Sequence, residues 1–218
     1  MEAMKINLVS FDADGTIVKD SYVDKFWFQE LPRLYARKKG IEFSEARETV
    51  TSKYNEIGDE DIRWYQPEYW FDRFELEEDP GEVIERIQVP ENVELYRDAV
   101  ELIEDIYGAY GLVVTSNAPR VFLEYALRSI EDRFRKVYSC VTDFGEVKKH
   151  PGVYQKVAER VGVNAGEMVH VGDHWRFDYQ VPRELGITSF YIDRDTGAEE
   201  RAENVLTDLR QLREFLPG

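Results

Sequence analysis

The chain has 218 residues, of which 43% are hydrophobic, and it carries a formal net charge of −16 with a single cysteine, Cys140. This length fits one large domain or a core with an inserted module, and the hydrophobic content excludes wholesale disorder. The acidic balance argues against nucleic acid or an anionic membrane as a partner. One cysteine excludes an intrachain disulfide, so we expect Cys140 to be a small, buried, apolar side chain.

No apolar stretch approaches the roughly 18 residues of a membrane span. The first residues lack the basic segment and apolar stretch of a secretory signal. We therefore expect a cytoplasmic protein. The sequence does not fix the oligomeric state, and a monomer is compatible with it.

The first predicted strand covers residues 5–11 and is apolar enough to be buried. It ends abruptly at Asp12-Ala13-Asp14-Gly15-Thr16, a run of residues typical of loops. A simple turn would explain this run, and so would a calcium loop. A calcium loop needs further oxygen ligands ending in a Glu, which the apolar residues at 17 and 18 do not provide. In a tight turn, Asp12 and Asp14 would point toward one cavity.

Residues 18–94 do not alternate between strand and helix, and they predict a small helical module inserted after the first strand. This segment holds Trp27, Trp64 and Trp70, three of the four tryptophans of the chain. We expect its aromatic side chains to form the core of the module. The expected helices cover residues 24–39, 44–57 and 67–74.

From residue 95 onward, apolar strands alternate with helical patterns, which predicts a mainly parallel sheet covered on both faces. The expected strands cover 111–115, 168–171 and 189–192, with a further short strand near 137–139. The expected helices cover 97–107, 121–130, 152–161, 177–185 and 208–215.

Polar residues follow three of the four clear strands, at Asp12 and Asp14, at Ser116 and Asn117, and at Asp173. Parallel sheets bind ligands beyond the carboxyl ends of their strands, so these side chains predict a site. Each signal has a plainer explanation when it is taken alone. Ser116 could be a helix cap, and the pair Lys148 and Lys149 could be a solvated surface feature. Asp173 and Asp178, five residues apart, could be a cap and a surface acid.

Taken together and in this order, the motifs resemble the haloacid dehalogenase superfamily, in its phosphatase branch with an inserted helical cap. The resemblance implies an α/β fold with a Rossmann-like parallel sheet core, residues 1–17 and 95–218, and a helical cap, residues 18–94. It covers essentially the whole chain. The segments that carry it are 11–16, 113–117, 148–154 and 170–173 together with Asp178.

The resemblance also implies a role for each matched residue. Asp12 would be the nucleophile, and Asp14 would be the general acid and base. Ser116, Asn117 and Lys148 would bind the phosphoryl group. The implied cofactor is Mg²⁺, with Asp12, the backbone carbonyl of Asp14 and Asp173 as ligands and Asp178 as their support.

The third motif departs from the family pattern, in which a proline follows the lysine. Here the segment reads Lys148-Lys149-His150-Pro151. Counting back from Pro151 makes Lys148 the equivalent lysine. Without that proline the backbone is less restricted, so Lys149 is a second candidate.

The expected activity is hydrolysis of a small phosphorylated metabolite by a Mg²⁺-dependent phosphomonoesterase, through an aspartyl-phosphate intermediate. Phosphate monoesters hydrolyse extremely slowly without a catalyst, and covalent catalysis divides the reaction into two easier steps. Dehalogenases need neither the acid at position 14 nor Asp173, so we do not expect cleavage of a carbon–halogen bond. Two alternatives stay open: a phosphotransferase such as a sugar-phosphate mutase of the same family, and a non-catalytic module that binds phosphate or a partner. We expect His170 to be buried and hydrogen-bonded, and His174 and Trp175 to line the mouth of the pocket.

Overall fold

The computed structural model describes residues 5–194 and 203–217, and the chain divides into two compact units. The first unit is Met1–Lys19 with Leu95–Gly218, and the second is Asp20–Glu94. Within the described ranges, no helix is both long and apolar enough to cross a bilayer. Residues 1–4, on which the expected absence of a secretory signal partly depends, lie outside these ranges.

The first unit is built on a six-stranded sheet in which every pairing is parallel. The strand order is β3-β2-β1-β4-β5-β6, so β2 and β3 are added on one side of β1 and β4 to β6 on the other side. The strand order therefore reverses between β1 and β4. This confirms the expected α/β fold with a helical insert between the first two strands. The strands are β1 (Leu8–Phe11), β2 (Gly111–Ser116), β3 (Lys136–Ser139), β4 (Met168–Gly172), β5 (Thr188–Ile192) and β6 (Val205–Leu206).

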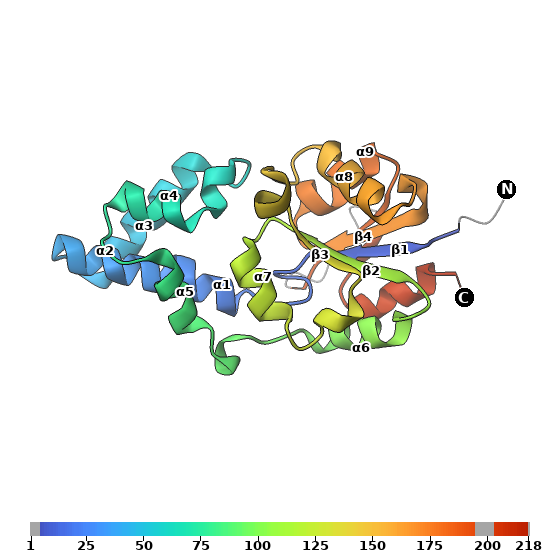
Figure 1. Ribbon diagram of the computed structural model, residues 1–218, viewed down its shortest axis with the longest axis horizontal. Coiled ribbons are helices and arrows are strands. Elements are labelled where there is room, and N and C mark those ends of the chain that lie inside the picture. The colour runs from blue at the N-terminus through green and yellow to red at the C-terminus, as the bar shows by residue number, and fades with distance from the viewer. Residues whose placement is uncertain (1–4, 195–202, 218) are drawn as a thin grey trace. The chain divides into compact units, whose positions relative to one another are not determined.

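Helices cover both faces of this sheet, which is why β1, β2 and β4 are buried along their whole length. Figure 1 shows α8 and α9 on one side of the sheet and α6 on the other, where α6 packs against the last helical segment, η8. The helices that cover the sheet are α6 (Arg97–Ile106), α7 (Arg120–Leu127), α8 (Pro151–Val161), the short α9 (Val181–Glu184) and the 3-10 helix η8 (Leu209–Phe215).

Several elements of the first unit differ from the prediction. The expected helix at 177–185 is a π-helix at Trp175–Gln180 followed by the short α9. The expected closing helix is a 3-10 helix, capped by Asp208, whose side chain accepts a hydrogen bond from the backbone nitrogen of Arg210. The strand β6 and a π-helix at Cys140–Phe144 were not predicted.

The second unit is entirely helical among its assigned elements. Its first three helical segments follow one another without a break from Ser21 to Lys39. They end at Gly40, whose φ of +66° is a left-handed conformation suited to glycine. The helix α5 was not predicted. The elements are α1 (Ser21–Lys25), η1 (Phe26–Glu30), α2 (Leu31–Lys39), α3 (Phe43–Ile57), η2 (Ile62–Tyr65), α4 (Pro67–Phe74), α5 (Pro80–Ile87) and η3 (Pro90–Asn92).

Aromatic side chains form the centre of this second unit, as the sequence predicts. Tyr54 packs edge-on against Trp70, with 4.6 Å between the ring centres. The Tyr54 hydroxyl donates to the carbonyl of Trp27 at 3.0 Å, and the Trp70 indole donates to the carbonyl of Trp64 at 3.1 Å. Their polar atoms are therefore satisfied where the rings are buried.

Candidate active site

The parallel register of the central strands brings the predicted acids together. Phe11 of β1 pairs with Val171 of β4, and the backbone nitrogen of Asp12 donates to the carbonyl of Val171 at 2.8 Å. Asp12 therefore leaves its strand beside the last residue of β4, and Asp173 is the next residue of that chain segment. The site lies where the strand order reverses, which is where open parallel sheets bind ligands.

Lys148 is buried in this site and joins two carboxylates. Its Nζ atom lies 2.6 Å from Oδ1 of Asp12 and 2.6 Å from Oδ1 of Asp178, and it also donates to the carbonyl of Thr115 at 3.1 Å. The side chain of Asn117 accepts a hydrogen bond from the backbone nitrogen of Lys148 at 2.9 Å. Of the two candidate lysines, Lys148 is the one that reaches Asp12.

Burial and the charges of the neighbouring groups shift the pKa values of Asp12, Lys148 and Asp178 in different directions. Burial would raise the pKa of Asp178, but Lys148 and His170 outweigh this effect and hold it well below its ordinary value. Burial and the neighbouring Asp178 raise the pKa of Asp12, although Lys148 acts in the opposite direction. Burial would lower the pKa of Lys148, but the two carboxylates raise it above its ordinary value. Lys148 and Asp178 are therefore ionised at neutral pH, and Asp12 is the acid that takes up a proton first.

Asp178 is held from several directions. Its Oδ1 lies 3.1 Å from Nε2 of His170, and its Oδ2 accepts from the backbone nitrogen of His174 at 3.0 Å. The other ring nitrogen of His170 lies 2.9 Å from the Ser10 hydroxyl. A carboxylate can only accept, so Nε2 carries the proton and Nδ1 accepts from Ser10. Burial lowers the pKa of His170, more than Asp178 raises it, so the ring is neutral.

Two glycines allow the acids to approach the backbone closely. A Cβ atom on Gly15 would lie 2.1 Å from Oδ2 of Asp173, and a Cβ atom on Gly172 would lie 2.4 Å from Cγ of Asp178. Neither glycine could carry a side chain without displacing a carboxylate. Gly15 also has a φ of +71°, a left-handed conformation that favours glycine.

Carboxylate oxygens of Asp12, Asp173 and Asp178 lie within 4.8 Å of one another. Oxygens on opposite sides of an octahedral Mg²⁺ are about 4.1 Å apart, because each lies about 2.0–2.1 Å from the metal. The three oxygens thus need only a small movement to share such an ion, and hard oxygen donors are the set that Mg²⁺ prefers. The residues fit a divalent metal site. Asp178 is already bound to Lys148 and His170, which suits support of the site better than direct ligation.

The other residues of the predicted site lie at the same edge of the sheet. Asp14 is partly exposed and pairs with Val18 across the turn after β1. Ser116 ends β2, and its hydroxyl accepts from the backbone nitrogen of Ala118 at 3.1 Å. The ring of His174 accepts from the backbone nitrogen of Phe177, and Trp175 is exposed and stacks on a neighbouring tyrosine. Their roles toward a substrate stay predictions.

Some residues of the site were not predicted from the sequence. The Tyr154 hydroxyl donates to the carbonyl of Phe177 at 2.6 Å and lies 3.1 Å from Nε2 of His170. The sequence offered one signal for it, since Tyr154 stands three residues after Pro151 in the third motif. Cys140 is fully buried, as expected, and burial raises the pKa of its thiol, so it is not a reactive thiolate.

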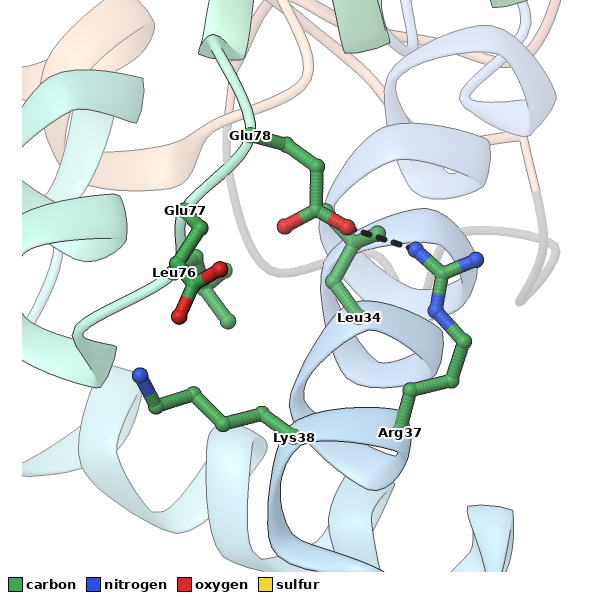
Figure 2. Close-up of a pocket in the computed structure, with 6 residues that line it drawn as sticks. All are labelled: Leu34, Arg37, Lys38, Leu76, Glu77 and Glu78. Carbon is green, nitrogen blue, oxygen red and sulfur yellow. Dashed lines mark hydrogen bonds and ion pairs between the residues drawn. The ribbon is translucent and has the colours of Figure 1, made fainter.

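The second unit has a separate hollow of about 600 Å³, shown in Figure 2, between α2 and the segment that follows α4. Arg37 forms an ion pair with Glu78 at 2.6 Å, and Lys38 donates to the carbonyl of Glu75. Two basic and two acidic side chains line it, so their formal charges cancel. The hollow therefore offers no net attraction for an anion.

The fold and the site define an α/β protein with a cluster of carboxylates that fits a divalent metal ion, and with a buried lysine, at the carboxyl edge of its sheet. The sequence pattern of the haloacid dehalogenase-like hydrolases matches residues 6–186. The chain therefore belongs to this family of hydrolases, which is the family that the motifs indicate.

Individual relatives support the same assignment. Haloacid dehalogenase-like hydrolase domain-containing protein 3 of Danio rerio is 32% identical over 130 residues, which are 56% of this chain and 53% of that protein, so the match spans about half of its length. The GMP/IMP nucleotidase YrfG of Escherichia coli (strain K12) is 20% identical over 220 residues, which are 98% of this chain and 95% of the nucleotidase.

Solved structures share the fold. A HAD phosphatase from Thermococcus onnurineus is 27% identical with a TM-score of 0.83, and the match covers 96% of this chain and 97% of the phosphatase. A 2-haloacid dehalogenase from Pseudomonas syringae pv. Tomato DC3000 has a TM-score of 0.70 at 20% identity, covering 96% and 97% of the two chains. The fold is thus common to enzymes of both activities.

Proposed function

We propose that this hydrolase is a Mg²⁺-dependent phosphomonoesterase that acts on a small phosphorylated metabolite through an aspartyl-phosphate on Asp12. One observation carries the proposal. The Nζ atom of Lys148 lies 2.6 Å from Asp12 in the same acid cluster as Asp173, so a cation already offsets part of the charge of the carboxylate that would approach a phosphate.

In the first step, a carboxylate oxygen of Asp12 forms a bond to phosphorus while the bond from phosphorus to the ester oxygen breaks. Asp14 donates a proton to that leaving oxygen, so the product departs as a neutral alcohol. Lys148 holds the Asp12 carboxylate and offsets charge on the transferring group. Ser116 is predicted to donate its hydroxyl hydrogen to a phosphoryl oxygen.

In the second step, Asp14 takes a proton from water and the resulting hydroxide attacks the phosphorus of the aspartyl-phosphate. The bond between phosphorus and Asp12 breaks, inorganic phosphate leaves, and both acids return to their starting states. Asp14 must therefore be protonated for the first step and ionised for the second.

Asp12, the backbone carbonyl of Asp14 and Asp173 would hold the Mg²⁺ ion, with Asp178 fixing Lys148 beside them. When bound, the ion neutralises charge on the phosphoryl oxygens and on Asp12, which lets the two anions approach. A divalent cation beside Asp12 also lowers its pKa and keeps the nucleophile ionised.

The residues favour a phosphatase over a dehalogenase, the other activity found on this fold. Phosphate transfer uses the acid Asp14 and the metal ligand Asp173, and the chain has both. The helical insert and the family relatives, which include a nucleotidase and a HAD phosphatase, support a small phosphorylated substrate.

The test is phosphate release from a panel of phosphorylated metabolites with Mg²⁺ present. We expect wild-type protein to release inorganic phosphate, chelation to stop release, and Mg²⁺ to restore it. Asp12→Asn should lose about 10³-fold or more in kcat and should form no phosphoenzyme, because the amide is a poor nucleophile.

Asp105→Asn is the matched control, because Asp105 is an exposed acid of the same unit that pairs with Arg213 at 3.0 Å. It should behave as wild type. Undiminished turnover by Asp12→Asn would exclude Asp12 as the nucleophile. Isomerised sugar phosphate without free phosphate would indicate the mutase instead.

A further inference from the structure

The side chain of Arg194 forms hydrogen bonds to the turn that follows the two proposed catalytic acids. Arg194 lies just after β5, and its Nε atom donates to the carbonyl of Gly15 at 3.0 Å. One of its terminal nitrogens donates to the carbonyl of Thr16 at 2.7 Å. These are the first two carbonyls after Asp14, so one guanidinium group fixes the chain immediately beyond the proposed acid and base.

Arg194 is itself held rigidly. Its other terminal nitrogen lies 3.2 Å and 3.0 Å from the two carboxylate oxygens of Asp98, in the first turn of α6. The guanidinium also stacks over the ring of Tyr96, 3.6 Å from the ring centre. Asp98 in turn accepts from the backbone nitrogen of Leu209 at 2.7 Å. The planar guanidinium group of arginine has five N–H donors and can make all of these contacts at once. The compact ammonium group of a lysine cannot make the same set of contacts.

The same turn is packed against Asp173 on its other side. Gly15 lies so close to that carboxylate that even a Cβ atom would overlap it. Inside the turn, the backbone nitrogens of Ile17 and Val18 donate to the carbonyl of Ala13 at 2.8 Å and 2.9 Å. The turn is therefore enclosed between a candidate metal ligand and the guanidinium of Arg194.

We propose that Arg194 is a positioning residue for the phosphatase reaction, which fixes the turn so that the Asp14 carboxyl meets the leaving oxygen. This inference rests on the proposed function. Arg194 acts through the backbone and touches no reacting atom. A displacement of the turn by about 1 Å would reduce proton donation, because misplacement on this scale costs about 10²-fold in rate.

The dependence on the leaving group separates this role from a purely structural one. kcat/KM reports the first irreversible step, in which an alkyl phosphate needs a proton from Asp14 and p-nitrophenyl phosphate, with its acidic leaving group, does not. With Mg²⁺ present, Arg194→Ala should lose about 10- to 100-fold in kcat/KM for the best alkyl phosphate of the panel and less than about threefold for p-nitrophenyl phosphate. Arg194→Lys should recover part of the loss, and Asp98→Asn should show the same selectivity more weakly.

Arg213→Ala is the matched control, since Arg213 forms an exposed ion pair of the same unit. It should leave both rates unchanged. Equal losses on both esters, or none on either, would overturn the proposal.

Hydrogen exchange tests the turn without any reaction. In Arg194→Ala the amides of Ile17 and Val18 should exchange at least about tenfold faster, while the amides of β2 and β4 stay as in wild type, because only the turn loses its anchor. Unchanged exchange would overturn the proposal whatever the activity. A wild-type protein that hydrolyses no ester would remove the proposed function, and the exchange rates would still decide whether Arg194 holds the turn.

Discussion

Replacing Gly172 with alanine should displace the most strongly held carboxylate of the site. The added Cβ atom would lie 2.4 Å from Cγ and 2.5 Å from Oδ2 of Asp178, whereas carbon atoms in contact are about 3.5 Å apart. Asp178 would have to move by about 1 Å, away from hydrogen bonds to Lys148 and His170 of 2.6 Å and 3.1 Å. Disrupting a buried ion pair costs about 3–5 kcal/mol. Because the Asp178 carboxylate is shifted and not removed, we expect a loss near the lower limit, about 3 kcal/mol.

Urea unfolding followed by circular dichroism measures this loss, and kcat measured on the folded protein should fall by at least about tenfold, because Lys148 loses one of its two partners. Gly152→Ala is the matched control. No atom approaches a Cβ at that position, which lies in the first turn of α8, so alanine should be neutral or stabilise by up to about 1 kcal/mol. If Gly172→Ala unfolded within 0.5 kcal/mol of wild type and kept its kcat, the carboxylate would not be confined as the structure has it.

Three further predictions follow from other parts of the molecule. Lys148→Met should abolish turnover and cost several kcal/mol of stability, because two buried carboxylates lose their common cation, whereas Lys149→Met should leave both properties near wild type. If the two variants changed kcat and the free energy of unfolding in urea by equal amounts, this prediction would be contradicted. Asp173→Asn should raise the Mg²⁺ concentration for half-maximal activity at least about tenfold, and an unaltered Mg²⁺ titration would exclude Asp173 as a ligand. Burial raises the pKa of Tyr54 well above its ordinary 10.0, so its contribution to stability is complete below pH 10 and is lost as the pH rises further. Tyr54→Phe should cost about 1 kcal/mol at pH 7 and reduce the alkaline loss of stability in urea titrations at several pH values, and an unchanged pH dependence would contradict it.

The parts of the fold that could be predicted are those in which local sequence and tertiary structure agree. The strand before Asp12 and the strand before Asp173 are short apolar stretches with polar ends, and both form, although the first begins at Leu8 and not at residue 5. The missed helix α5 had its own local signals. Asp79 caps it by accepting from the backbone nitrogen of Glu82, and Pro80 occupies the first helical position. The helix has only eight residues, so its hydrophobic repeat is too short to stand out without these end signals.

Other features depend on contacts between distant residues and leave little trace in the local sequence. Strand β6 has only two residues and exists because Val205 and Leu206 pair with β5. The π-helical segments shift the hydrogen-bond register by one residue, which hydrophobic spacing does not reveal. Arg194 illustrates the same limit in the site, because its partners Gly15 and Asp98 are 179 and 96 residues away along the chain.

The balance of charge is the reason why the proposed phosphatase reaction would need a divalent cation at this site before a phosphate ester binds. Asp12, Asp173 and Asp178 supply three carboxylates, and Lys148 supplies one ammonium, so the ionised cluster carries two negative charges in excess. The neutral ring of His170 adds nothing to this sum. A dianionic phosphate would be repelled by the cluster alone, and the chain as a whole, at −16, adds to that repulsion. Burial, and after it the neighbouring Asp178 carboxylate, raise the pKa of Asp12 in this cluster, although Lys148 acts in the opposite direction. One divalent cation would cancel the excess charge, and its field would favour the ionised, nucleophilic form of Asp12.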